Sequence, residues 1–207
     1  VIKVYVWNSK GEPLYYDDLK IELWTPVEQA KGTDAPPGYR KMGKIYENGF
    51  EDPTLPYVVK TPVASGKQAY NLTKEQEYSP ALRQWGSELD VKIEKDDYLK
   101  ITFAANRMAD YLDPNSNSFL SVNLKSNTST KDIHRHFSIE DQLRAEGGQV
   151  RGVWKTMVYW VHFPKGVEPE NQLAVYLRKP KTSSADNLFI DDLKVEVWRK
   201  VSTGTSK

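Results

Sequence analysis

The chain has 207 residues, and its 29 basic side chains nearly balance its 28 acidic ones. This balance, without a basic stripe between aromatic residues, gives no indication of a nucleic-acid partner. The absence of cysteine excludes disulfide bonds and thiolate metal sites. No apolar run approaches the roughly 18 residues that a membrane-spanning helix needs.

Short segments in which apolar and polar residues alternate dominate the chain. They predict strands, because successive side chains of a strand point to opposite faces of its sheet. In chain order, the predicted strands are 2–6, 99–104, 119–124, 157–163, 173–177 and 193–197. Residues 138–145 predict a short helix that begins after Ser138 and stops at a Gly-Gly pair. Together they indicate an all-β antiparallel sandwich or jelly roll.

The same pattern occurs near both ends of the chain. Residues 15–24 (YYDDLKIELW) match residues 189–198 (FIDDLKVEVW), and the strands that precede them also match. The repeated unit is therefore a β-hairpin. We interpret residues 1–24 as the closing hairpin of a preceding, similar domain. A linker rich in proline and glycine follows at 25–44, and residues 201–207 form a polar tail.

Five motifs occur in a recognisable order between these hairpins. They are NGFE at 48–51, SGKQAY at 65–70, DYLKITFAA at 97–105, VW at 153–154 with the strand that follows, and FIDDL at 189–193. In this order they resemble jelly-roll carbohydrate-binding modules of the family 4, 9, 16 and 22 kind, which have a galactose-binding-like sandwich. The resemblance covers about residues 45–200.

The resemblance implies a non-catalytic module of a larger protein that acts on polysaccharides or sits at a cell surface. Its partners would be a polysaccharide or oligosaccharide and the neighbouring domains of the same polypeptide. Its location would be extracellular, at the cell surface or in the periplasm. The alternative is a spacer or adhesion domain without glycan binding, because a fold alone does not decide function.

The resemblance also implies a structural calcium ion, held by Glu51 with Asp191 and Asp192. Calcium prefers six to eight oxygen ligands, which carboxylates and backbone carbonyls supply. Alternation predicts that Asp191 shares a face with the apolar residues Leu193 and Val195, where an unpaired carboxylate would be costly. The alternative is that these carboxylates accept backbone N–H hydrogen bonds at the end of a strand.

Alternation in two late strands predicts a binding surface. In 157–163, Tyr159, Val161 and Phe163 form the expected core set, whereas Trp160 and His162 point the other way. Tyr176 and Arg178 point away from the core in 173–177 and just after it. These four outward side chains form one patch for sugar stacking and hydrogen bonding if the two strands are neighbours.

Candidate catalytic groups are sparse, and we expect no enzymatic activity. Glycosidases need two carboxylates at a defined separation. Glu88, Asp90 and Glu94 alternate in the sequence, and we interpret them as the solvated face of a strand. His134 and His136 would lie on one side of a strand, with no obvious third metal ligand beside them.

Overall fold

The computed structural model describes residues 35–107, 117–126, 133–145, 152–183 and 187–201. The described residues form two antiparallel sheets, one with six strands and one with four. The predicted hairpin at 1–24 lies outside these ranges, as do residues 25–34 of the predicted linker and residues 202–207 of the polar tail.

The six-stranded sheet is organised around β10. Its strands are β1 (Tyr39–Asn48), β2 (Val58–Val59), β3 (Ala69–Leu72), β5 (Asp97–Arg107), β8 (Lys155–Phe163) and β10 (Leu188–Lys200). The order is β2–β3–β10–β5–β8, and β1 pairs with β10 beyond the segment that pairs with β3. Within this sheet β8 is therefore an edge strand among the described residues. The first strand begins at Tyr39, inside the predicted linker.

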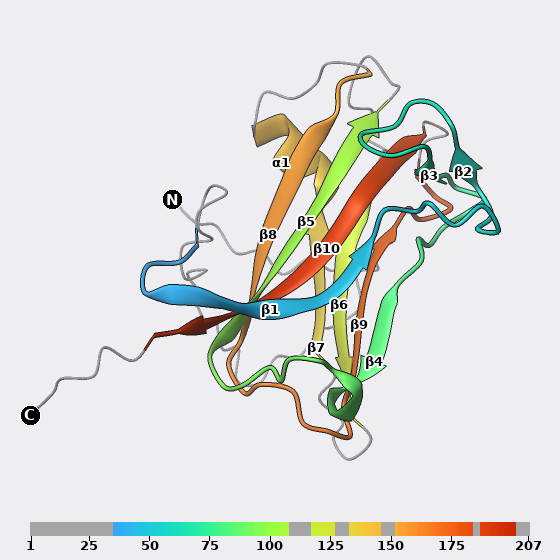
Figure 1. Cartoon of the computed structure of the whole chain (residues 1–207). Coiled ribbons are helices and arrows are strands. Elements are labelled where there is room, and N and C mark those ends of the chain that lie inside the picture. Colours follow the sequence, from blue (N-terminus) through green and yellow to red (C-terminus); the bar gives the residue numbers. More distant parts are fainter. Residues whose placement is uncertain (1–34, 108–116, 127–132, 146–151, 184–186, 202–207) are drawn as a thin grey trace, which may run out of the picture.

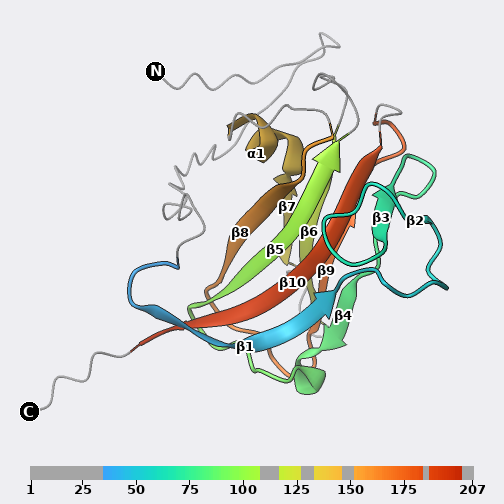
Figure 2. The same cartoon turned by 45° about the horizontal axis from the view of Figure 1, so that its top comes forward.

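The four-stranded sheet packs behind the first one (Figure 1). Its strands are β4 (Leu82–Trp85), β6 (Phe119–Lys125), β7 (Ile133–Ser138) and β9 (Gln172–Arg178), in the order β4–β9–β6–β7. The turned view in Figure 2 also shows β1, β10, β5 and β8 side by side in front of this second layer. The predicted antiparallel sandwich is confirmed.

The core lies between the two sheets and follows the predicted alternation. Leu99, Ile101 and Phe103 of β5 are buried, as are Val175 and Leu177 of β9. The predicted core set of β8 is also confirmed, because Tyr159, Val161 and Phe163 are buried in the same cluster. Burial of such side chains contributes roughly 1.5–3 kcal/mol each.

A β-bulge in β10 overturns one prediction from alternation. The pairing with β5 shifts between Asp191 and Lys194, and Asp192 adopts a left-handed backbone conformation with φ of 53°. The extra residue reverses the alternation, as a bulge does. Asp191 pairs with Ala104, on the outer face of β5, whereas Leu193 points into the core. The prediction that Asp191 shares a face with Leu193 is therefore wrong.

The helical elements are short. α1 (Ile139–Ala145) follows β7 directly, and the Ser138 hydroxyl accepts a hydrogen bond from the Asp141 N–H at 3.1 Å, which confirms the predicted N-cap. A 3-10 helix, η1 (Gly86–Glu88), follows β4. In the described ranges, no helix has the length and apolar character needed to cross a membrane.

The strand predicted for Glu88, Asp90 and Glu94 is wrong, because η1 and a loop occupy this segment, whereas the predicted exposure of the three residues to solvent is confirmed. The physical reason is backbone pairing: the Val167 N–H donates to the Ile93 carbonyl at 2.9 Å, and the Ser87 N–H donates to the Pro169 carbonyl at 3.1 Å, so this segment bonds to another loop and not to a strand. Glu94 is not free for chemistry, because it forms an ion pair with Arg199 at 2.7 Å.

Candidate functional site

The four residues predicted to form one patch lie on different sheets. Trp160 and His162 belong to β8 of the six-stranded sheet, and Tyr176 and Arg178 belong to β9 of the four-stranded sheet. The strands are not neighbours, so the condition for a single patch is not met. Two outer faces must therefore be considered separately.

The outer face of the six-stranded sheet is an aromatic cluster. Trp160 lies 5.3 Å from Trp198 of β10, measured between ring centroids. The ammonium of Lys100, on the strand between them, lies 5.3 Å from the first ring and 5.7 Å from the second. Trp160 is only 6% exposed. This tryptophan therefore offers little surface on which a ligand could stack.

His162 continues this cluster toward the end of the sheet. Its ring lies 4.8 Å from that of Tyr98, and its Nε2 lies 3.3 Å from a carboxylate oxygen of Asp96. Burial raises the pKa of Tyr98. Tyr39 packs edge-on against Tyr98 at 5.0 Å, and its hydroxyl donates to the Asp96 carbonyl at 3.3 Å.

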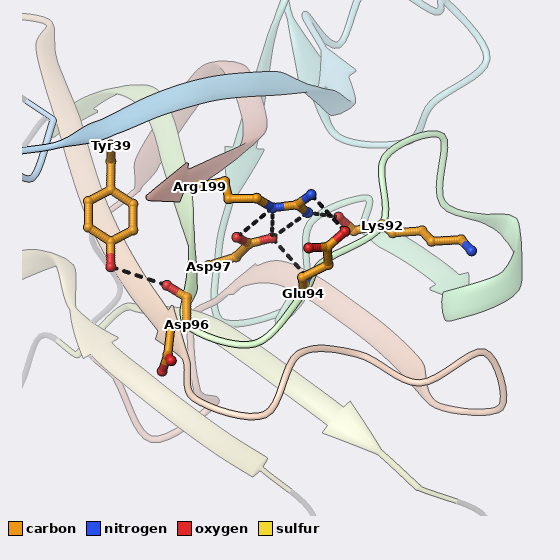
Figure 3. A network of polar contacts seen from close by, with 6 residues as sticks. All are labelled: Tyr39, Lys92, Glu94, Asp96, Asp97 and Arg199. Carbon is orange, nitrogen blue, oxygen red and sulfur yellow. Dashed lines mark hydrogen bonds and ion pairs between the residues drawn. The ribbon is translucent and has the colours of Figure 1, made fainter. Parts of the chain in front are cut away.

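A buried ion pair lies next to this end of the sheet (Figure 3). Asp97 is fully buried, and the Arg199 guanidinium donates to both of its carboxylate oxygens, at 2.9 Å and 2.8 Å. Arg199 also donates to the Lys92 carbonyl at 2.9 Å. Hydrogen bonding to Asp97 raises the pKa of Arg199. The network fastens the end of β10 to the loop before β5.

The outer face of the four-stranded sheet is more accessible. Tyr78 is 46% exposed and packs edge-on against Tyr176, with ring centroids 5.7 Å apart. The Arg178 guanidinium lies 5.5 Å from the Tyr78 ring and forms an ion pair with Glu77 at 2.6 Å. The hydrogen bond that Arg178 donates to Glu77 raises the pKa of Arg178. The two aromatic rings and the cation are thus fixed beside one another.

Polar side chains extend this surface across the next two strands. The Asn123 amide donates to the Tyr176 hydroxyl at 2.9 Å. The same amide's oxygen lies 3.1 Å from Nδ1 of His134 on β7, and His134 is exposed. One row above, His136 is exposed and lies 3.0 Å from the Ser121 hydroxyl. The two histidines therefore share the outer face.

The strand register places further side chains on this face. Arg83 lies opposite Ala174, and Trp85 lies opposite Gln172. Ala174 in turn lies opposite Asn123. Paired residues of neighbouring strands point to the same side of a sheet. Arg83 and Asn123 therefore flank the small residue Ala174 on this face.

The three predicted calcium ligands all contact one loop. The Asp191 carboxylate accepts from the N–H groups of Ala64 and Ser65, both at 3.1 Å. The Ser65 hydroxyl donates to Asp192 at 2.8 Å, and the Lys67 N–H donates to Glu51 at 2.9 Å. The carboxylates thus tie residues 64–67 to the ends of β1 and β10.

A glycine makes this close contact possible. Gly66 has a φ of 62°, and a Cβ atom there would lie 1.9 Å from Oε1 of Glu51.

Burial raises the pKa of Asp191. No three His, Cys, Asp or Glu side chains in the described part of the chain are grouped so that they could hold a metal ion. The geometry fits the hydrogen-bonded alternative, and calcium binding stays a prediction.

Sequence reasoning missed several members of the accessible face. Tyr78 lies outside a strand, and Arg83 and Trp85 belong to the short strand β4, whose alternation spans only four residues. The one usable signal was the alternation in β9, which predicts that Tyr176 and Arg178 point away from the core. The partners of β9 depend on long-range pairing, which alternation does not encode.

No protein-family model matches the sequence, and no curated protein matches it. The structure is similar to the CBM22-1 xylan-binding domain of Xyn10C from Paenibacillus barcinonensis, with 13% identity and a TM-score of 0.49. The match covers 76% of this chain and 97% of that domain.

Two further solved structures show the same kind of similarity. The C-terminal family 22 module of Clostridium thermocellum Xyn10B has 11% identity and a TM-score of 0.49, with 77% of this chain and 96% of that one covered. A family 16 carbohydrate-binding module has 9% identity and a TM-score of 0.42, with 67% and 82% covered. At these identities the similarity concerns the fold alone: the chain resembles β-sandwich carbohydrate-binding modules.

Proposed function

We propose that the chain is a non-catalytic carbohydrate-binding module of a larger extracellular protein, and that glycans bind the outer face of the four-stranded sheet. One observation carries the proposal. The row formed by Tyr78, Tyr176, Asn123 and His134 runs from an exposed aromatic ring to an exposed imidazole, and its members are held by contacts to one another.

The chemistry of this row suits a sugar. Flat aromatic faces pack against the C–H groups of a pyranose ring, and amide, imidazole and guanidinium groups pair with hydroxyls. Because Arg178 is already clamped by Glu77, little side-chain freedom would be lost on binding. Trp160 is not assigned to the site, because its ring is nearly fully buried.

Affinity electrophoresis against plant, algal and host polysaccharides tests the proposal. We expect Kd values on the order of 10 µM to 1 mM, or roughly 4–7 kcal/mol. Tyr78→Ala should weaken binding by about 1–3 kcal/mol, by analogy with bases stacked on aromatic side chains. Tyr57→Ala is the matched control, because Tyr57 is 48% exposed and lies beside the other sheet. A wild-type chain that binds no glycan would favour the spacer or adhesion alternative.

Calcium at Glu51, Asp191 and Asp192 is a separate proposal, supported by the resemblance and by the convergence of these carboxylates on one loop. A ligand that binds only the folded state raises its stability by mass action. Calcium should therefore raise the melting temperature of the wild type, and Glu51→Gln should abolish that rise. If calcium and a chelator leave melting unchanged, hydrogen bonds alone hold the loop.

A further inference from the structure

We infer that this glycan-binding face is built for an acidic oligosaccharide, one whose sugars carry carboxylate or sulfate groups. The inference rests on the function proposed above and names the class of ligand. Two observations support it. The face carries basic side chains, and no acidic side chain among the described residues points outward from it.

The charges on the face are predominantly basic. Outward positions of β4, β9, β6 and β7 follow from the register and hold no aspartate or glutamate among the described residues. They hold the basic or protonatable side chains Arg83, Lys125, Arg178, His134 and His136. Glu77 lies beside the face, but its carboxylate is occupied by Arg178 at 2.6 Å. A neutral glycan would not require this bias.

Two of these cations have no acidic partner among the described residues. In the described part of the chain, neither Arg83 nor Lys125 forms an ion pair, and both are exposed. The outer face of the six-stranded sheet differs: Lys41 pairs with Glu196, and Lys194 pairs with Glu47 at 3.3 Å. These two lysines are neutralised within the fold, whereas Arg83 and Lys125 are left for an external anion.

Arg83 also occupies a suitable position. It lies opposite Ala174, the small residue between Gln172 and Tyr176 on β9. Trp85 faces Gln172, four residues from Tyr176, which is about 13 Å at the usual rise of a strand. In the register, Arg83 therefore lies between two aromatic positions that sugars of one chain would occupy. A planar guanidinium binds a carboxylate or sulfate through two parallel hydrogen bonds.

Apart from Glu77, two acidic residues of the described part of the chain lie at the Trp85 end of the face. The Glu88 carboxylate accepts a hydrogen bond from the Trp85 N–H at 2.9 Å, and Glu170 lies in the turn before β9. Neither Glu88 nor Glu170 lies at a paired position that Arg83, Tyr176 or the two histidines share across the strands. We therefore assign recognition of the anion to Arg83 and not to the Trp85 end.

Calorimetry with a matched pair of ligands tests the inference. An oligogalacturonate should bind the wild type at least about tenfold more tightly than its fully methyl-esterified form at low salt. This preference should shrink in 0.5 M salt, as exposed charge interactions do. Arg83→Gln should remove the preference. Arg40→Gln, at an exposed position of β1 away from this face, should keep it. A sulfated galactan oligosaccharide and its desulfated form make the same comparison for sulfate.

The outcomes separate the inference from the proposed function. A preference for either anion that Arg83→Gln abolishes supports the inference. Equal binding of charged and neutral forms, lost in Tyr78→Ala, overturns the inference but keeps the glycan-binding function. A preference that survives Arg83→Gln overturns the assignment to Arg83. Binding of none of these ligands or of the polysaccharide panel contradicts both.

Discussion

The two outer faces of the sandwich carry similar residue types but differ in how those residues are used. On the six-stranded sheet, Trp160, Trp198 and Lys100 contact one another, and Trp160 is almost fully buried. On the four-stranded sheet, Tyr78 is exposed, and the row of contacts beside it ends in the exposed His134. An outward tryptophan is thus no sign of a binding site by itself, and exposure decides which face meets a ligand.

If this comparison is right, substitutions on the six-stranded sheet change stability, and substitutions on the accessible face of the four-stranded sheet change binding. The largest expected effect is that of Trp160→Ala. Loss of a buried tryptophan typically costs about 3–5 kcal/mol of unfolding free energy. Urea denaturation should show this loss, while the fraction that stays folded binds glycan as the wild type does.

If the Trp160→Ala variant folds but no longer binds glycan, the assignment of binding to the four-stranded sheet is contradicted. This result would return the site to β8, where the sequence placed two of its four candidates. Tyr78→Ala is the counterpart on the other face, and its unfolding free energy should change by less than about 1 kcal/mol, as is usual for exposed side chains.

The next largest effect concerns the ion pair in Figure 3. Arg199→Met leaves the Asp97 carboxylate buried without its cation. We expect a loss of about 2–3 kcal/mol, below the 3–5 kcal/mol typical of fully buried pairs, because Arg199 is 25% exposed. Arg40→Met, at the position that pairs with Arg199 in β1, is the control and should cost little.

A matching change in glycan affinity would contradict our account of the network as a structural fastener. Chemical denaturation with a binding assay on each variant measures both quantities.

The smallest effect is a pH dependence at the end of the four-stranded sheet. Glu140, at the start of α1, is buried and accepts the Ser118 N–H at 2.7 Å. Burial raises the pKa of Glu140 above its ordinary value of about 4.3. Between the two values the folded state binds more protons, so stability falls as pH rises through this window.

Glu140→Gln keeps an oxygen acceptor and removes the titration. The variant should lose this part of the pH dependence, and unfolding free energies from urea denaturation between pH 4 and 7 would show it. An unchanged slope would mean that another group causes the dependence.

Much of the fold was predictable because five strands follow a simple alternation. β5, β6, β8, β9 and β10 were all expected near their observed positions. β1 was missed because two register shifts break its alternation. Alternation does not predict β7, because its IHRHFS sequence places polar side chains on both faces.

The candidate site was only half predictable for a related reason. Alternation gave the outward direction of Tyr176 and Trp160 correctly, but it does not say which strands pair. The assignment of β8 and β9 to different sheets comes from contacts between segments far apart in the sequence. The bulge at Asp192 is a local change in backbone conformation, and the loop that hydrogen-bonds to Asp191 stabilises it. The pattern of apolar residues does not indicate such a bulge.

The most direct test of the central claim is a titration of the isotope-labelled chain with a bound glycan, followed by amide NMR shifts. Our account predicts that the largest shifts fall in β9, β6, β7 and β4, around Tyr176, Asn123, His134 and Arg83. Amides around Trp160, Lys100 and Trp198 should change little. Shifts concentrated in β8, β5 and β10 would contradict the assignment and place the glycan on the six-stranded sheet.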